Sequence, residues 1–343
     1  MMGVTSQEVS LKEDFVRVFG VPPAMEPYVD LVADADEMEL VVALDDRAMT
    51  LEEVAEVMRL SQPEAAELLR KALRREIVNQ QGTAGASTYS RADFYLRLDI
   101  LSSYETPAWS SLPPWRRRAV SEWQIAEWIQ RWAPELERII RDPDDYVRMK
   151  NRDILLLDEA IELVEAAEYI CALRCPCITT LLPGSPVVEG SVRLGERARL
   201  TLERGQGRSL STEEAKSHLI ALDRAGLVHT GPRFWRQHDP QLEWVSHGNC
   251  HPSYSFPMRA GLRLGLAKQY PRAHHVGRFD WDACTHCGLC IGRCPFGALS
   301  RADTPYRTHG VLQKHIRFDP DHCWGCGLCA NTCPEEAITM EGL

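Results

Sequence analysis

The sequence predicts an α+β chain built from several domains. Its 343 residues exceed the roughly 100–200 residues of a typical domain, so we expect two or three domains. Helical periodicity dominates the first part, and mixed helix and strand signals fill the middle. The last part repeats a strand, a cysteine-rich loop and a helix at an interval of about 39 residues. We therefore expect a helical domain over residues 1–145, an α/β domain over 146–275 and an α+β domain over 276–343.

The composition is that of an ordinary folded protein. Hydrophobic residues make up 44% of the chain and charged residues 26%, which excludes disordered, collagen-like and coiled-coil classes. No apolar run approaches the roughly 20 residues that span a bilayer, and the first residues lack the basic stretch and apolar core of an export signal. We therefore expect a cytoplasmic protein without a membrane span.

The negative charge is concentrated in the first part of the chain. Residues 1–80 contain 8 Lys and Arg against 17 Asp and Glu, a net charge of −9, whereas the whole chain has a net charge of −10. Binding to a nucleic-acid backbone requires clustered Lys and Arg. The sequence therefore favours a protein partner with a basic docking surface over nucleic acid.

Two helix starts follow each other closely near residue 50. Thr50 with Glu53, and Ser61 with Glu64, form capping boxes, and each opens an amphipathic run. Two short helices joined by a tight turn predict a helix-turn-helix, and the strand-like stretch 89–101 supplies a wing, so the region is winged-helix-like. This fold serves either as a DNA-binding module or as a protein-interaction or structural module. The acidic surroundings of the basic residues on the second helix favour protein interaction; these residues are Arg70, Lys71, Arg74 and Arg75.

The stretch 112–141 is predicted to be one amphipathic helix, and the acidic, proline-containing residues 142–145 after it mark the domain boundary. Indole side chains at helical spacing indicate packing in a core rather than a cofactor stack. The large apolar positions are Trp115, Trp123, Trp128, Ile129 and Trp132.

Twelve cysteines in a chain expected to be cytoplasmic indicate metal ligation rather than disulfides, because that compartment keeps thiols reduced. Eight of them form two runs of the same spacing, Cys-x2-Cys-x2-Cys-x3-Cys-Pro. In this spacing three cysteines hold one iron–sulfur cluster and the fourth reaches the other cluster. Zinc sites do not require two identical four-cysteine runs. We therefore predict two [4Fe–4S] clusters, one held by Cys284, Cys287, Cys290 and Cys333, and the other by Cys323, Cys326, Cys329 and Cys294.

The residues around both runs agree with this prediction. Gly288, Gly292 and Gly327 permit tight backbone turns, and a strand-like segment precedes each run. Residues 276–343 resemble a bacterial-type 2[4Fe–4S] ferredoxin domain, which implies a ferredoxin-like fold of two strand–loop–helix units related by a pseudo-twofold axis. The 28 residues between the two runs exceed those of minimal ferredoxins, and we expect the excess, residues 302–315, to form a surface loop that serves in docking.

The middle segment carries the remaining four cysteines, after a predicted helix over residues 158–170. A Cys-x-Cys pair chelates a metal, and two further thiolates would complete a site for a third [4Fe–4S] cluster or for zinc. The alternative is that these cysteines are the buried thiols of a degenerate site. The four candidates are Cys171, Cys175, Cys177 and Cys250.

A further helix in this segment is predicted by its ends. A capping box of Ser211 and Glu214 begins it and Gly226 ends it. Beyond it, Cys250 is flanked by His247 and His251, which we interpret as structural histidines rather than ligands.

The order of these pieces resembles a poorly characterised family of ferredoxin-domain proteins from anaerobic bacteria and archaea. That family has a winged-helix-like first region, a Cys-x-Cys segment after a helix, and a second cysteine-rich segment before the ferredoxin domain. This sequence differs in two places, because Ile178 stands where an arginine usually follows Cys-x-Cys, and the second segment retains only Cys250. The resemblance implies an anaerobic host.

The motifs together predict an electron-transfer protein or a subunit of a redox complex, which passes single electrons between redox protein partners. The chain has no dinucleotide fingerprint, no phosphate-binding glycine loop and no nucleophile–base set, so we predict no catalytic residues and no independent catalysis. Two alternatives stay open. One is a redox-sensing winged-helix regulator, and the other is an oxidoreductase with a third metal site in the middle domain.

Overall fold

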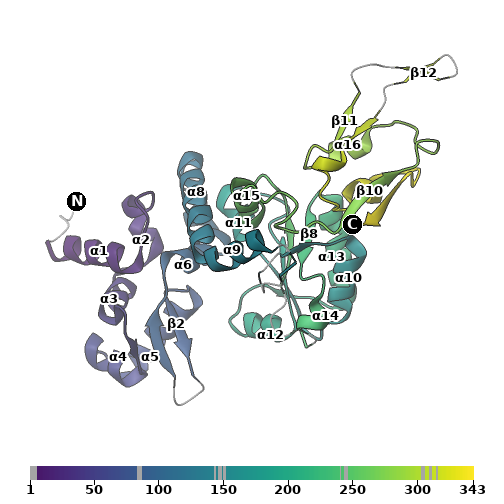
Figure 1. The fold of residues 1–343 in the computed structure, drawn as a ribbon. Helices are drawn as coiled ribbons and strands as arrows, with labels where there is room; N and C mark the ends of the chain where they lie inside the picture. Colours follow the sequence, from purple (N-terminus) through teal and green to yellow (C-terminus); the bar gives the residue numbers. More distant parts are fainter. Residues whose placement is uncertain are drawn as a thin grey trace. The chain divides into compact units, whose positions relative to one another are not determined.

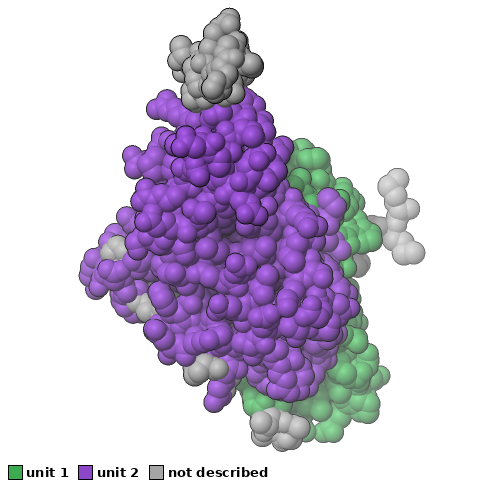
Figure 2. Space-filling view, turned by 90° about the vertical axis from the view of Figure 1, so that its right-hand side faces the viewer, with its two compact units in different colours: residues 1–127, 176–185 green, residues 128–175, 186–343 purple. Residues whose placement is uncertain are grey.

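The computed structural model of the chain describes residues 6–82, 87–142, 144–145, 149, 152–239, 241–242, 246–302, 306–308, 311–313 and 316–343. The chain divides into two compact units, shown as ribbons in Figure 1 and in separate colours in Figure 2. Unit 1 comprises Met1–Glu127 and Pro176–Ser185, and unit 2 comprises Trp128–Cys175 and Pro186–Leu343. The division into three domains at residues 145 and 275 stays a prediction.

Unit 1 is mainly helical. Its elements in chain order are α1 (Ser6–Phe19), a 3-10 helix η1 (Glu26–Tyr28), α2 (Val29–Val32), α3 (Ala35–Leu44), β1 (Ala48–Met49), α4 (Leu51–Met58), α5 (Gln62–Arg74), β2 (Val78–Gln81), β3 (Thr88–Arg91), α6 (Phe94–Ser103), α7 (Thr106–Ser110), most of α8 (Pro114–Arg131) and α11 (Pro176–Leu181).

Local capping determines where α4 and α5 begin. Thr50 N donates to Glu53 Oε2 at 2.7 Å, and Glu53 N donates back to Thr50 Oγ1 at 3.3 Å. At the next helix, Ser61 N donates to Glu64 Oε2 at 2.9 Å. Both capping boxes expected from the sequence are confirmed.

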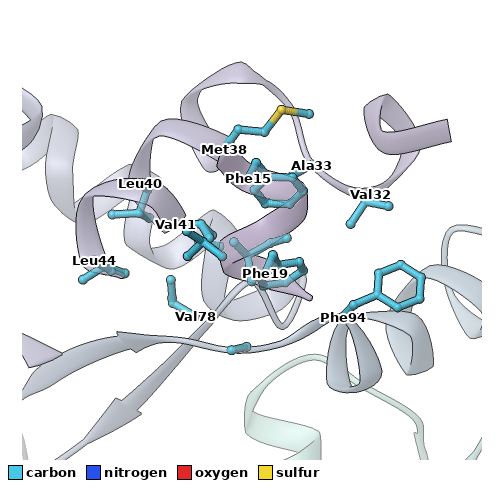
Figure 3. Packing of buried hydrophobic residues seen from close by; sticks show 14 of the residues in the cluster. Phe15, Phe19, Val32, Ala33, Met38, Leu40, Val41, Leu44, Val78 and Phe94 are labelled. Atoms are coloured by element: carbon cyan, nitrogen blue, oxygen red, sulfur yellow. The ribbon is translucent and has the colours of Figure 1, made fainter. Parts of the chain in front are cut away.

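The core of unit 1 lies between its helices and its small sheet. Phe15 and Phe19, one turn apart on α1, stack with their ring centroids 4.9 Å apart. Figure 3 shows these rings beside Val41 of α3, with Val78 of β2 below them. Burial of this continuous apolar cluster holds the helices together.

A three-stranded antiparallel sheet combines β1, which precedes α4, with β2 and β3, which follow α5, and β3 lies between β1 and β2. The strand expected over residues 89–101 is wrong beyond Arg91. The Asp93 carboxylate accepts a hydrogen bond from Leu96 N at 3.0 Å and caps α6, so the chain becomes helical from Phe94 onward.

The single helix expected over residues 112–141 is also wrong, because α8 ends at Arg131 and a new helix, α9 (Ala133–Arg141), follows. Pro134 has no N–H to continue the hydrogen bonding of α8, and it lies in the first turn of α9, where proline is tolerated. The indoles belong to a core only in part. Trp128 is buried and Trp123 packs edge-on against Phe94, whereas Trp115 is 62% exposed.

An ion network crosses the interior of unit 1. The fully buried Arg97 donates from Nη2 to Glu105 Oε2 at 2.6 Å, and Arg75 donates from Nε to Glu105 Oε1 at 3.0 Å. Arg75 also pairs with the buried Glu37. Burial by itself would raise the pKa of Glu105, but the hydrogen bonds from Arg75 and Arg97 outweigh it and lower that pKa.

Unit 2 contains a six-stranded sheet with the strand order β4-β8-β9-β6-β5-β7, and two further strand pairs that carry the cysteine runs. No helix among the described residues of the chain is long and apolar enough to cross a lipid bilayer. The elements that follow α9 are β4 (Asp153–Ile154), α10 (Leu157–Glu165), β5 (Ile170–Leu173), β6 (Ser191–Leu194), α12 (Glu196–Glu203), β7 (Arg208–Ser209), α13 (Thr212–Arg224), β8 (Val228–Gly231), α14 (Trp235–His238), β9 (Ser246–Cys250), α15 (Phe256–Arg263), β10 (His275–Phe279), α16 (Leu289–Arg293), β11 (Leu299–Arg301), β12 (Tyr306–Thr308), β13 (Val311–Gln313), β14 (Ile316–Phe318), a 3-10 helix η2 (Pro320–His322), α17 (Leu328–Thr332) and β15 (Ile338–Gly342).

The helix expected over residues 158–170 is wrong past Glu165. The segment Ile170–Leu173 is an apolar run buried throughout, which suits a central strand, and it forms β5. The helix expected after Ser211 is confirmed as α13, which begins with the Ser211–Glu214 capping box and ends two residues before Gly226. Together α10 and α13 cover one face of the sheet, through residues such as Leu163 and Leu219.

The two cysteine-bearing repeats exchange strands. The first strand, β10, pairs antiparallel with the last, β15, while β11 pairs antiparallel with β14. Each repeat thus completes the sheet of the other, as a pseudo-twofold relation requires. Within the expected surface loop 302–315, Tyr306–Thr308 and Val311–Gln313 pair as a hairpin, and most of the other residues of that loop lie outside the described residues.

Candidate metal centre

Each cysteine run forms the loop between a strand and a short helix. In each run, two cysteines precede the helix, one lies on it, and the last ends it. The runs are Cys284, Cys287, Cys290 and Cys294 around α16, and Cys323, Cys326, Cys329 and Cys333 around α17. Residues at equivalent positions of the two repeats therefore have equivalent structural roles.

The backbone of the two loops repeats the same left-handed turns. His286 (φ 56°) corresponds to Gly325 (φ 64°), and Gly288 (φ 83°) corresponds to Gly327 (φ 79°). A Cβ at residue 325 would lie 2.0 Å from the carbonyl oxygen of His275, so only glycine fits there. The turns expected at Gly288 and Gly327 are confirmed. Gly292 instead lies inside α16 with ordinary helical geometry.

One group of thiols combines the first three cysteines of run one with the last of run two. The Cys290 thiol is buried and lies within electrostatic range of three others, those of Cys284, Cys287 and Cys333. Burial, and then repulsion between these groups when ionised, raise the pKa of Cys290 to about 11.

The second group has the reciprocal composition. The Cys326 thiol is buried, and burial together with the thiols of Cys329, Cys294 and Cys323 raises its pKa. The pKa of Cys329 is raised to about 12, first by burial and then by Cys323, Cys294 and Cys290. Since Cys290 belongs to the first group, the two groups lie next to each other.

Four clustered thiols suit a cluster of several iron ions. The thiolate is the form that binds metal, and burial and mutual repulsion raise the pKa of Cys290, Cys326 and Cys329, so a cationic partner must compensate the charge of their thiolates. A single zinc ion needs donor atoms about 2.0–2.3 Å away. Among the described residues, no three His, Cys, Asp or Glu side chains are placed to hold one ion. Three cysteines of one run and one of the other are the ligand set that a [4Fe–4S] cluster uses.

The two loops differ in their access to solvent. Around the first loop, Cys287 is exposed, Trp281 is 45% exposed and Leu289 is 53% exposed. The Trp281 ring stacks on Phe279 with centroids 4.8 Å apart, and the exposed carboxylates Asp280 and Asp282 flank it. This loop presents an aromatic and acidic rim to solvent.

The second loop is instead buried against the six-stranded sheet. Trp324, Cys326 and Leu328 belong to one apolar cluster, and Trp324 stacks on Phe296 with ring centroids 4.5 Å apart. The sheet and its helix α15 contribute the other buried members of the cluster, which are Ile154, Val228, Cys250 and Met258. The second loop is thus screened from water on the side of the sheet.

The structure does not bring Cys171 and Cys250 together as the third site requires. Cys171 on β5 lies opposite Arg193 on β6, which lies opposite Ser246 on β9, and Cys250 is four residues farther along β9. Two strand spacings and four residues correspond to roughly 16 Å, too far for one zinc ion or one cluster. Cys175 is buried beside the Val188 carbonyl, and Cys177 lies on α11 in unit 1. A third metal site stays a prediction, and the separation of Cys171 from Cys250 does not support one that holds all four cysteines.

The two histidines beside Cys250 have hydrogen-bonding roles. His247 Nε2 lies 3.2 Å from Asn249 Oδ1, and His251 stacks on Tyr254 while its Nδ1 accepts from Ser253 N. Sequence reasoning missed two further polar residues of this region, His229 and Asp223. No motif marks them, because strand register brings His229 to His247 and helix packing brings Asp223 to His229.

Comparison with protein families identifies the region that contains both cysteine runs. Residues 283–337 match the family described as the 4Fe-4S dicluster domain. Comparisons with curated proteins and with solved structures gave no match. The chain therefore carries a C-terminal ferredoxin-type domain that binds [4Fe–4S] clusters.

Proposed function

We propose that the chain relays single electrons between redox proteins through two [4Fe–4S] clusters. Cys284, Cys287, Cys290 and Cys333 would hold one cluster, and Cys323, Cys326, Cys329 and Cys294 the other. Once bound, such clusters take up and return single electrons. The protein supplies the thiolate ligands, the spacing between the two centres and their different exposure to water.

The observation that carries this proposal is the division of eight thiols into two adjacent groups of four. Each group takes three cysteines from one run and one from the other, and Cys329 lies within electrostatic range of Cys290 of the other group. Two redox centres held this closely favour electron passage between them over independent roles.

The difference in exposure supports an entry point at the first loop. Cys287 is exposed there, whereas Cys326 is buried beneath the sheet. The rim of this loop carries Asp280 and Asp282, and carboxylates there favour a partner with a basic surface. A redox protein would therefore dock at the first loop, and the second loop would exchange electrons with the first.

The first unit supports a role in binding protein rather than DNA. The order α3–β1–α4–α5–β2–β3, with β3 between β1 and β2, supports a winged-helix-like module. Three of the four basic side chains on or directly after its second helix are paired with carboxylates of the same unit: Arg70 with Glu67, Lys71 with Asp34, and Arg75 with Glu37 and Glu105. DNA binding would require these pairs to break. A gel-shift experiment at moderate salt tests the alternative. Sequence-specific DNA binding that depends on the state of the clusters would favour a redox-sensing winged-helix regulator.

Iron analysis of anaerobically purified protein tests the relay. Two clusters require about eight irons and eight sulfides per chain, and about twelve irons would restore a third site. Cys326→Ser should reduce the iron content to about half and remove one of two reduction steps. The matched control is Cys177→Ser, which changes a cysteine outside both runs and should leave iron and both steps unchanged. Two intact reduction steps in Cys326→Ser would show that the ligand assignment is wrong.

A further inference from the structure

A chain of polar side chains runs from the interior of the six-stranded sheet to the second cysteine loop. We call it the polar chain; it consists of His247, Asn249, His229, Asp223 and Asn331. The two histidines are 0% exposed, Asn249 is 1% exposed and Asp223 is 4% exposed. Asn331 lies on α17, between Cys329 and Cys333. Polar groups this deeply buried require a structural or chemical reason.

The amide of Asn249 fixes the orientation of both imidazoles. Its Nδ2 donates to the carbonyl of Gly190 at 3.3 Å, so its Oδ1 faces the histidines and accepts from them. His229 Nδ1 lies 2.8 Å from this oxygen and His247 Nε2 lies 3.2 Å from it. Because an amide oxygen only accepts, His229 Nδ1 carries the proton of the 2.8 Å hydrogen bond, and Nε2 of this neutral ring has a lone pair.

The second nitrogen of His229 faces a carboxylate. His229 Nε2 lies 3.6 Å from Asp223 Oδ1 and has no hydrogen-bond partner among the described residues. Asp223 is held in place from the cysteine loops, because Asn331 Nδ2 donates to its Oδ1 at 2.9 Å and Arg293 Nη2 donates to its backbone carbonyl at 2.6 Å. Two acceptors therefore face each other across a gap that one added proton would bridge.

We propose that Nε2 of His229 is a proton-binding site linked to reduction of the cluster held by the second loop. One electron from a one-electron donor enters that cluster, and one proton from water adds to Nε2, where the only new bond is N–H. Oxidation reverses both transfers. This inference rests on the proposed electron relay.

The position of His229 explains why the two events are coupled. Asp223, which faces His229, accepts a hydrogen bond from Asn331, and Asn331 lies on α17 two residues from Cys329. An electron added to the cluster held by the second loop places a negative charge near His229 in a region of low dielectric, which favours the charged imidazolium. Asp223 stabilises the same form as an ion pair.

The other charged groups around His229 are already engaged. On the neighbouring strand β4, Asp153 pairs with His274 at 2.7 Å, and on α10, Glu159 pairs with Arg233 at 2.7 Å. Burial, and then the charges of His229 and His218, lower the pKa of His247 to about 3, so His247 stays neutral near pH 7. His229 is thus the group of the polar chain that is placed to bind a proton.

Protons need a route from solvent to this buried site. His218 on α13 lines a shallow surface pocket together with Ser217, Arg208, Glu213 and Glu214. His218 is the last of the causes that lower the pKa of His247, which lies 3.2 Å from His229 between ring nitrogens. A proton route from this pocket would pass His218 and then His247.

The test is the pH dependence of the reduction potentials of the full-length protein. Redox titrations with dithionite and mediators, followed by electron paramagnetic resonance, would run from about pH 6 to about pH 9. In the wild type we expect the equilibrium constant for reduction of one cluster to fall at least about tenfold as the pH rises over this range. That change corresponds to a decrease of ~59 mV in its reduction potential. In His229→Gln this potential should be independent of pH. The matched control is His238→Gln, on the exposed side of α14, which should behave as the wild type.

Asp223→Asn provides a second variant if His229→Gln does not fold, because it preserves size and keeps an oxygen for Asn331. It should move the pH-dependent range to lower pH, since the imidazolium loses its carboxylate. Clusters present with pH-independent potentials in the wild type would overturn the inference alone, whereas absence of clusters would overturn the electron relay. A pH dependence unchanged in both variants would place the proton elsewhere, at His286 or His322 beside the cysteines, and would also overturn it.

Discussion

Gly325→Ala tests whether the second cysteine loop depends on its backbone conformation. Gly325 has φ 64°, which costs an alanine about 1 kcal/mol. The new Cβ would also lie 2.0 Å from the carbonyl oxygen of His275, a backbone atom that cannot rotate away because His275 pairs with Gly342 in the β10–β15 sheet. Relieving such overpacking costs about 1–3 kcal/mol. We therefore expect a destabilisation of about 2–4 kcal/mol.

Urea unfolding of the cluster-loaded protein, followed by the visible absorption of the clusters, measures this effect. A loss of 2–4 kcal/mol should lower the unfolding midpoint of this domain by about 1–2 M urea. The control is Gly292→Ala in the first repeat, where an added Cβ meets no atom within 4 Å and the backbone is helical. It should leave the midpoint unchanged or raise it. Equal midpoints for Gly325→Ala and the wild type would refute the reasoning.

The remaining predictions concern the scaffold, measured by urea unfolding of the full chain. Glu105→Gln should cost about 3–5 kcal/mol at neutral pH, because it leaves Arg97 buried without its carboxylate. Folding lowers the pKa of Glu105 from 4.5, so its stabilisation is present above that value and is lost as the pH falls through the folded pKa. Acidification should therefore reduce the difference in the free energy of unfolding between the wild type and Glu105→Gln. A difference that does not change with pH would contradict this. Ser211→Ala should cost about 1 kcal/mol by removing the cap of α13, whereas Ser209→Ala on the exposed β7 should cost almost nothing.

Patterns that depend on nearby residues could be predicted from the sequence. The capping boxes at Thr50, Ser61 and Ser211 each involve two residues of one helical turn, and all three are present in the structure. The cysteine spacing, its repeat and the left-handed turns at Gly288 and Gly327 are equally local. The presence of the ferredoxin-type domain therefore followed from the sequence.

Expectations that extended a local pattern too far were wrong. The helix expected over 158–170 gives way to a strand because the sheet buries Ile170–Leu173 between other strands. The stretch expected as a wing turns helical after Arg91 because one carboxylate, that of Asp93, caps α6. The first outcome depends on neighbouring strands that are distant in the sequence, and the second depends on a single capping side chain.

The sequence by itself determined which residues form the cysteine loops, because their spacing is a property of one short segment. Only the tertiary structure decided that Cys287 is exposed while Cys326 is buried, since the apolar cover of Cys326 comes from Ile154, Val228 and Met258. It also decided that His229 faces Asp223. Burial and strand register depend on residues far apart along the chain, and no spacing along a single sequence encodes which of them will meet.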